Sequence, residues 1–234
     1  MAVAETREQP SRSDLYRVNG DRVQAAAAAP LAGSAADGTA PAGAASAGVG
    51  MGQSPARALV CGPSGGGKSR WAEHLAARSC RQVVYLATGP LLPDDPDWQQ
   101  RLQRHRCRRP ASWQCLEVGG QLAPALAELA EGQLGLVDSL GTWIAAWLAS
   151  DDDTWLLRCG ELLETLRSCL APLVLVAEEV GWGVIPATRD GCRFQARLTA
   201  LQLQIAGQCD AHWLVVGGRA LDLMQLGESV PAEL

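Results

Sequence analysis

A glycine-rich segment at positions 62–69, GPSGGGKS, combines residue types that could hold a chain of phosphates. It satisfies the spacing G-x-x-x-x-G-K-[ST], with the apolar run ALVC before it and the amphipathic run SRWAEHLAAR after it. Glycines let the backbone wrap closely, so that successive N–H groups and the start of the next helix face an anion. We therefore predict that the phosphates of a nucleoside triphosphate bind to Gly62, Pro63, Ser64, Gly65, Gly66, Gly67, Lys68 and Ser69.

Lys68 is the only lysine among the 20 basic residues of the chain. A compact ammonium can reach the β and γ phosphates, whereas a planar guanidinium does not fit the same cradle. The Ser69 hydroxyl should help to hold Mg²⁺. The alternative is a glycine-rich turn with an incidental Lys-Ser pair, but the strand and helix patterns on either side favour the phosphate site.

Asp138 directly follows the apolar run LGLV at 134–137. Open α/β sheets place their ligand sites at the carboxyl ends of parallel strands, and an acidic residue there commonly holds the Mg²⁺ of the nucleotide. We therefore predict that Asp138 is a metal ligand, directly or through water. The alternative, compatible with the first, is that Asp138 caps a helix that begins near Ser139.

The segment RLQRHRCRR at 101–109 contains five arginines around His105. Such a run is more often a solvated helix face, although its charges repel one another unless an anion or water lies among them. An imidazole among arginines is favoured in its neutral form, which can attack phosphorus. The spacing alone leaves both interpretations of His105 open.

Apolar and amphipathic runs alternate from about residue 58 to about residue 217. We expect strands at 58–61, 83–87, 114–118, 134–137, 173–177 and 213–216. The clearest helical patterns between them lie at 155–170 and 194–205. Continuous apolar strands separated by helices are typical of a mostly parallel sheet with helices on both faces. The predicted fold is therefore α/β, a P-loop domain of the RecA-like type.

Residues 24–50 are nearly all alanine, glycine, proline and serine, a composition that cannot bury enough surface to offset its ordering entropy. We expect a disordered extension at 1–55, the nucleotide-binding domain at 56–220 and a C-terminal tail at 221–234. Met51 follows the low-complexity stretch, and we hypothesise that it is the translation start.

The 234 residues carry a formal net charge of -5, which argues against a general nucleic-acid binder. The eight cysteines include no C-x-x-C pair, so we expect free thiols and a reducing cytoplasm. The N-terminal residues lack the pattern of a secretory signal. No apolar run approaches the roughly 20 residues of a membrane span, and we expect no stable membrane anchor.

Four segments are together distinctive: LVCGPSGGGKSR at 59–70, VVYLATG at 83–89, RLQRHRCRRPASW at 101–113 and VAEEVGWGVIP at 176–186. With them the chain resembles the bifunctional adenosylcobinamide kinases and adenosylcobinamide-phosphate guanylyltransferases of the cobalamin pathway, over 58 to about 217. Ordinary P-loop kinases carry neither of the last two segments.

The resemblance implies that His105 becomes covalently guanylylated and that a conserved acidic position of the family corresponds to Asp138. It implies phosphorylation of adenosylcobinamide by ATP or GTP, then transfer of GMP from GTP to give adenosylcobinamide-GDP, and a small homo-oligomer. The implied nucleotide contacts are Thr88, Gly89, Pro90, Arg106, Cys107, Arg108, Arg109 and Glu117.

The chain departs from this pattern in two places. Arg104 stands where the family usually has the first of two adjacent histidines. In the helix at 194–203, an Asp, a Gly and an Asn-Gln pair are replaced by Ala196, Thr199, Gln202 and Leu203. Two other interpretations therefore stay open: a P-loop kinase with only one of the two activities, and a degenerate nucleotide-binding regulator. Glu178 or Glu179 could be the general base of the kinase step, on position alone.

Overall fold

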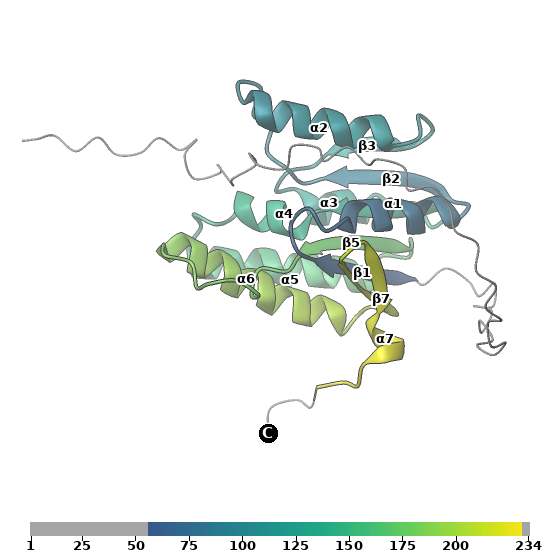
Figure 1. The fold of residues 1–234 in the computed structure, drawn as a ribbon. Helices are drawn as coiled ribbons and strands as arrows, with labels where there is room; N and C mark the ends of the chain where they lie inside the picture. The colour runs from purple at the N-terminus through teal and green to yellow at the C-terminus, as the bar shows by residue number, and fades with distance from the viewer. Residues whose placement is uncertain (1–55, 231–234) are drawn as a thin grey trace, which may run out of the picture. The chain divides into compact units, whose positions relative to one another are not determined.

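A computed structural model describes residues 56–230 (Figure 1). The extension predicted to be disordered at 1–55, Met51 included, and the last part of the predicted tail lie outside the described residues. In chain order the elements are β1 (Arg57–Gly62), α1 (Lys68–Arg78), β2 (Gln82–Ala87), α2 (Pro96–Arg108), β3 (Gln114–Glu117), α3 (Leu122–Ala127), β4 (Gln133–Asp138), α4 (Leu140–Ala146), α5 (Asp152–Ser168), β5 (Leu173–Glu178), α6 (Arg189–Ala206), β6 (Ala211–Val216), β7 (Arg219–Asp222) and α7 (Leu223–Leu226).

The described strands form a seven-stranded sheet in the order β3-β2-β4-β5-β1-β6-β7. Every neighbouring pair is parallel except β6 and β7. The first six strands coincide with the six predicted segments, and the prediction of a mostly parallel α/β sheet is confirmed. This order places β1, and the glycine-rich loop that follows it, between β5 and β6.

The predicted C-terminal tail at 221–234 contains regular structure, because β7 ends there and α7 follows it. Gly217 and Gly218 both adopt positive φ and connect β6 to β7 as a tight hairpin. A two-residue glycine loop is a known hairpin signal, because L side chains rarely accept this conformation. The short strand that follows alternates exposed and half-buried residues, as an edge strand does.

Two apolar cores lie on opposite faces of the sheet, because alternate residues of each strand point to opposite sides. In β1, Leu59 and Cys61 belong to the core covered by α3, α4, α5 and α6. Ala58 and Val60 belong to the other core, which α1 covers with Ala72 and Ala76. Helices therefore cover both faces, as predicted.

Helix α2 is held differently from the others. Asp95 caps it by accepting a hydrogen bond from the Trp98 backbone N–H at 3.0 Å, and Pro96 occupies its first position. Among its described side chains none is fully buried. The placement of α2 therefore depends largely on polar contacts, among them those of its last turn, where His105 lies.

Candidate active site at the carboxyl edge of the sheet

The glycine-rich loop connects β1 to α1 with the backbone conformation that the motif predicts. Gly62, Gly65 and Gly67 have φ values of 152°, 72° and 101°, which favour glycine. A Cβ at Gly62 would also overlap the carbonyl of Val215 in β6. Gly67 is the N-cap of α1 and provides no side-chain cap, so the first N–H groups of the helix face the loop. The Lys68 side chain is buried, and its Nζ donates to the Pro63 carbonyl at 2.9 Å.

Asp138 is the last residue of β4, but it does not cap α4. The N-cap is Ser139, whose Oγ accepts a hydrogen bond from the Thr142 N–H, while the Thr142 Oγ1 accepts one from the Ser139 N–H. The capping alternative for Asp138 is therefore wrong. Its carboxylate instead accepts a hydrogen bond at Oδ2 from the Tyr85 hydroxyl, at 2.6 Å.

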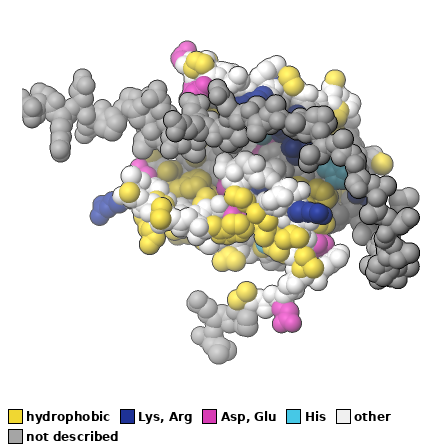
Figure 2. All heavy atoms as spheres, viewed as in Figure 1, with side chains coloured by type: hydrophobic (Ala, Val, Ile, Leu, Met, Phe, Trp, Pro, Cys, Tyr) yellow, Lys and Arg dark blue, Asp and Glu magenta, His cyan; other side chains and the backbone are white. Residues whose placement is uncertain are grey.

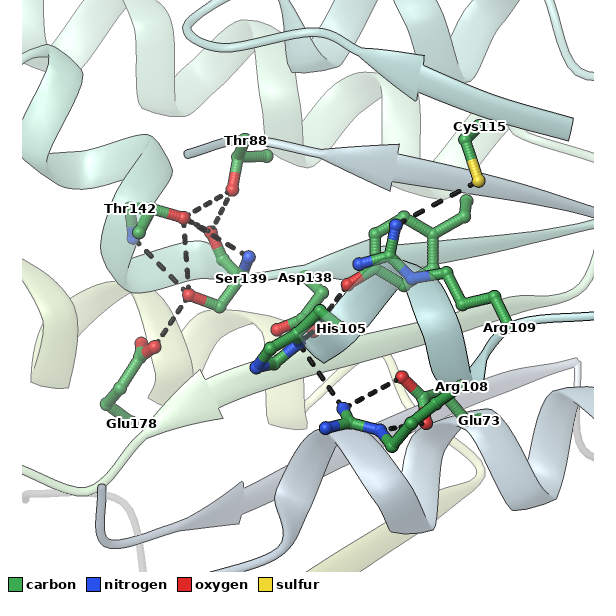
Figure 3. A network of polar contacts seen from close by, with 11 residues as sticks. Glu73, Thr88, His105, Arg108, Arg109, Cys115, Asp138, Ser139, Thr142 and Glu178 are labelled. Atoms are coloured by element: carbon green, nitrogen blue, oxygen red, sulfur yellow. Dashed lines mark hydrogen bonds and ion pairs between the residues drawn. The ribbon is translucent and has the colours of Figure 1, made fainter. Parts of the chain in front are cut away.

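His105 lies in the last turn of α2 and faces this carboxylate (Figure 3). Its Nδ1 is 3.8 Å from Asp138 Oδ2 and 3.3 Å from a guanidinium nitrogen of Arg108. Arg108 in turn donates two hydrogen bonds, of 3.1 and 3.2 Å, to the Glu73 carboxylate of α1. Because these contacts join α2 to α1 and β4, His105 belongs to the edge that carries the P-loop rather than to a purely solvated helix face.

Arg109, which directly follows α2, stacks on the ring of Tyr85 with its guanidinium carbon 3.3 Å from the ring centre. One of its terminal nitrogens donates to Cys115 Sγ at 3.9 Å. Its Nε is buried and has no hydrogen-bond partner within the described part of the chain. Tyr85 itself is buried, and burial raises the pKa of its phenol far above the usual value, so the hydroxyl remains a donor.

Glu117 and Asp138 lie at the same edge of the sheet, as predicted, because both pair with Ala87 from opposite sides of β2. The Glu117 carboxylate accepts a hydrogen bond from Arg106 at 2.9 Å. This ion pair attaches the last turn of α2 to the end of β3. A direct role for either residue in nucleotide binding stays a prediction.

The other predicted nucleotide contacts lie around the start and the end of α2. The Thr88 hydroxyl is buried and donates to the Ser139 carbonyl at 2.6 Å, so it stabilises the β2–β4 edge. Gly89 packs against the Trp98 ring, and the Pro90 carbonyl accepts from the Trp98 Nε1 at 2.8 Å. Cys107 is exposed and contacts Gln103 of its own helix.

Sequence reasoning did not identify Tyr85 and Glu73, and the general-base role considered for Glu178 or Glu179 stays a prediction. Glu178 accepts from the Ser139 hydroxyl at 2.6 Å and from the Gly141 N–H at 3.0 Å, so it anchors the start of α4. Glu179 accepts from Gln202 at 3.3 Å. The signal for Tyr85 was a lone hydroxyl inside an otherwise apolar strand, because a buried hydroxyl needs a partner. Nothing in the sequence around Glu73 indicates its ion pair with Arg108, apart from its place on the helix after the P-loop.

All eight cysteines lie in the described residues and are free thiols. No helix in the described part is both long and apolar enough to cross a membrane.

Comparison with known proteins places these features in a family. Residues 58–223 match the family model described as CobU: cobinamide kinase / cobinamide phosphate guanyltransferase. The bifunctional adenosylcobalamin biosynthesis protein CobP of Pseudomonas aeruginosa is 37% identical over 172 residues, covering 71% of this chain and 96% of that protein. The corresponding CobU proteins of Salmonella typhimurium and Escherichia coli are each 31% identical over 175 residues, covering 68% of this chain and 95% of theirs. The chain therefore belongs to the cobinamide kinase / cobinamide phosphate guanyltransferase family, as its four distinctive segments predicted.

Proposed function

We propose that the chain carries out both reactions of its family with the residues gathered at the carboxyl edge of its sheet. ATP or GTP gives its γ-phosphoryl group to the aminopropanol hydroxyl of adenosylcobinamide. GMP from a second GTP then passes through His105 to adenosylcobinamide phosphate, which yields adenosylcobinamide-GDP. The placement of His105 beside Asp138, on the edge that also carries the P-loop, is the observation that supports this proposal most directly.

The P-loop residues bind the triphosphate in both reactions. The backbone N–H groups of the loop and the first turn of α1 face the phosphates, and Lys68 exchanges the Pro63 carbonyl for a phosphate oxygen. Arg106 and Arg108 in the last turn of α2, with Arg109 directly after it, add positive charge near the transferred group. Positioning and charge stabilisation of this kind are most of what phosphoryl transfer requires of a protein.

Ser69 and Asp138 are the proposed ligands of Mg²⁺. A hydroxyl and a carboxylate oxygen suit this hard cation, which usually takes one or two protein ligands and completes its shell with phosphates and water. When bound, Mg²⁺ neutralises charge on the phosphates.

His105→Ala tests the proposal, because it separates the two reactions within one chain. Purified protein is incubated with GTP labelled at the α-phosphate, and phosphorylation of adenosylcobinamide is measured on the same preparation. We expect the acid-labile, alkali-stable label of the wild type to disappear in the variant, together with guanylyl transfer, by several orders of magnitude. The kinase reaction should continue.

The outcome also decides between the other interpretations. A wild type that transfers the γ-phosphoryl group without acquiring a label would be a kinase alone, and one that binds nucleotide without turnover would be a regulator. Label that persists in His105→Ala would contradict the assignment of the nucleophile, and His74 and His212 would be the next residues to replace.

We also propose that the protein forms a homo-oligomer in the cytoplasm. Large apolar side chains are exposed on the described surface, among them Leu203 of α6, and Figure 2 shows apolar side chains gathered over the half of the molecule where α6 lies. Such patches mark contact surfaces more often than chance. Free and partly exposed thiols suit a reducing compartment. Light scattering that returns the monomer mass would contradict the first of these two proposals.

A further inference from the structure

We propose that Tyr85 is a positioning residue for guanylylation: it holds the Asp138 carboxylate so that this carboxylate orients His105 at Nδ1. The inference rests on the proposed function, because it takes His105 as the nucleophile. It adds a role for Asp138 that differs from metal binding, and a role for Tyr85, which lies in the VVYLATG segment but had no role assigned from the sequence.

Tyr85 is a permanent hydrogen-bond donor to Asp138. It lies in the middle of β2 with 1% of its surface exposed, and its hydroxyl donates to Asp138 Oδ2 at 2.6 Å. Because the ring is enclosed in the core beside α1, the hydroxyl has little freedom to turn away. The buried Tyr85 hydroxyl therefore fixes the position of Asp138 Oδ2.

The same ring also contacts the segment that carries His105. The Arg109 guanidinium stacks on it with 3.3 Å between the guanidinium carbon and the ring centre, and Arg109 follows His105 by one helical turn. The Tyr85 side chain thus contacts both partners, Asp138 through its hydroxyl and the end of α2 through its ring face. The 3.8 Å separation of His105 Nδ1 and Asp138 Oδ2 depends on both contacts.

His105 Nδ1 has two neighbours with opposite chemical effects. Arg108, 3.3 Å away, is only a donor and favours the tautomer with its proton on Nε2. The Asp138 carboxylate is an acceptor and favours the proton on Nδ1, which places the ring lone pair on Nε2. Only the second tautomer lets Nε2 attack phosphorus. The carboxylate must therefore be held firmly in place for the productive tautomer to prevail, and the Tyr85 hydroxyl holds it.

The covalent step balances with this assignment. The Nε2 lone pair forms a bond to the α-phosphorus of GTP, the bond from that phosphorus to the bridging oxygen breaks, and its electron pair leaves with pyrophosphate. The ring then carries a positive charge and keeps its proton on Nδ1, where Asp138 stabilises it, as a buried carboxylate does for a catalytic imidazolium. Transfer of GMP to a phosphate oxygen of adenosylcobinamide phosphate returns the ring to its neutral form.

Tyr85→Phe tests the inference, because it removes the hydroxyl and keeps the ring that Arg109 covers. In single-turnover labelling with α-labelled GTP at saturating Mg²⁺, we expect the maximal labelling rate to fall about tenfold, the loss expected when a hydrogen bond to a charged group is removed. The GTP concentration for half-maximal rate should change little at saturating Mg²⁺, and the rate of adenosylcobinamide phosphorylation should fall by less than the labelling rate. Ser150→Ala, which removes a hydroxyl bonded to the Trp147 carbonyl, is the matched control and should change neither rate.

A second measurement does not depend on turnover. The chain has three histidines, so the side-chain ¹⁵N signals of His105 can be assigned with single variants. We expect a shift of the His105 proton from Nδ1 toward Nε2 in Tyr85→Phe.

Wild-type labelling rates in Tyr85→Phe, or an unchanged tautomer, would overturn the inference. An equal fall in both reactions would also overturn it, because Tyr85 would then act on the shared nucleotide or metal site. If the wild-type label does not require His105, the proposed function fails first. If covalent labelling requires His105 but proceeds at the wild-type rate in Tyr85→Phe, the proposed function stands and only the inference about Tyr85 fails.

Discussion

At the residue scale, the P-loop lysine shows how a single cation is prepared for phosphate. The Lys68 side chain is buried and donates to a carbonyl of its own loop, so its ammonium already lies within the cradle that the glycines form. A carbonyl is a weaker partner for an ammonium than a charged phosphate oxygen is. An exchange of partners on nucleotide binding is therefore favourable and needs little movement of the loop.

We expect Lys68→Ala to lower kcat/KM for adenosylcobinamide phosphorylation by a factor on the order of 10² to 10³, the loss that follows removal of one charge-stabilising donor. Lys68→Arg should restore only part of this, because the planar guanidinium does not fit the cradle. Steady-state kinetics with ATP as the varied substrate would measure both variants. Arg70→Ala, which removes an exposed cation from the same helix, is the control. A normal rate in Lys68→Ala would show that the loop does not serve this reaction.

At the scale of elements, α2 depends on a few ion pairs, whereas α5 and α6 are fixed by buried leucines. Burial of one leucine side chain contributes about 1.5–3 kcal/mol to the free energy of unfolding, while an exposed ion pair contributes about 0–1 kcal/mol. The helix that carries His105, the proposed nucleophile, is therefore the most weakly attached of these three. The Arg108–Glu73 pair and the Arg106–Glu117 pair attach it to α1 and to β3.

Glu73→Gln should slow the covalent labelling of His105 about fivefold, because loss of roughly 1 kcal/mol at the α1–α2 contact lets His105 leave its place beside Asp138. Labelling by α-labelled GTP measures this directly. The matched control is Glu164→Gln, which removes the carboxylate partner of Arg167 on the outer face of α5 and should leave labelling unchanged. Equal labelling rates in the two variants would mean that the Glu73 contact does not position α2.

At the scale of the whole molecule, the sheet order brings the parts of the site together. Strands β2 and β4 are neighbours although β3 lies between them in the chain, so Tyr85 meets Asp138 across 53 residues of sequence. The P-loop opens at the same edge, between β5 and β6. The family match begins at residue 58, which leaves the Ala/Gly/Pro-rich extension outside the part that the relatives share.

Deletion of residues 1–55 should therefore leave both activities unchanged and the melting temperature within about 2 °C, the shift produced by less than 1 kcal/mol in a domain of this size. The composition of the extension gives it little apolar surface to contribute to the fold. Deletion of residues 219–234 is the contrasting variant, because it removes β7 from its pairing with β6, and it should lower the melting temperature by about 5 °C. Calorimetry on the full-length protein and on the two deletion variants would measure both shifts in melting temperature. A large loss of stability in the first deletion would contradict the predicted boundary at residue 55.

The sequence by itself determined the features that depend on residues close together in the chain. The P-loop, the six parallel strands and the long helices follow from local spacing and hydrophobic period, so they could be predicted without the structure. The tertiary structure decided which distant side chains meet. Tyr85 contacts Asp138 across 53 residues, and Arg108 reaches Glu73 across 35 residues. No local pattern encodes these contacts, because they depend on strand order and on how α2 packs. The candidate site at the carboxyl edge, with a histidine beside an aspartate, therefore depends on the assembled sheet.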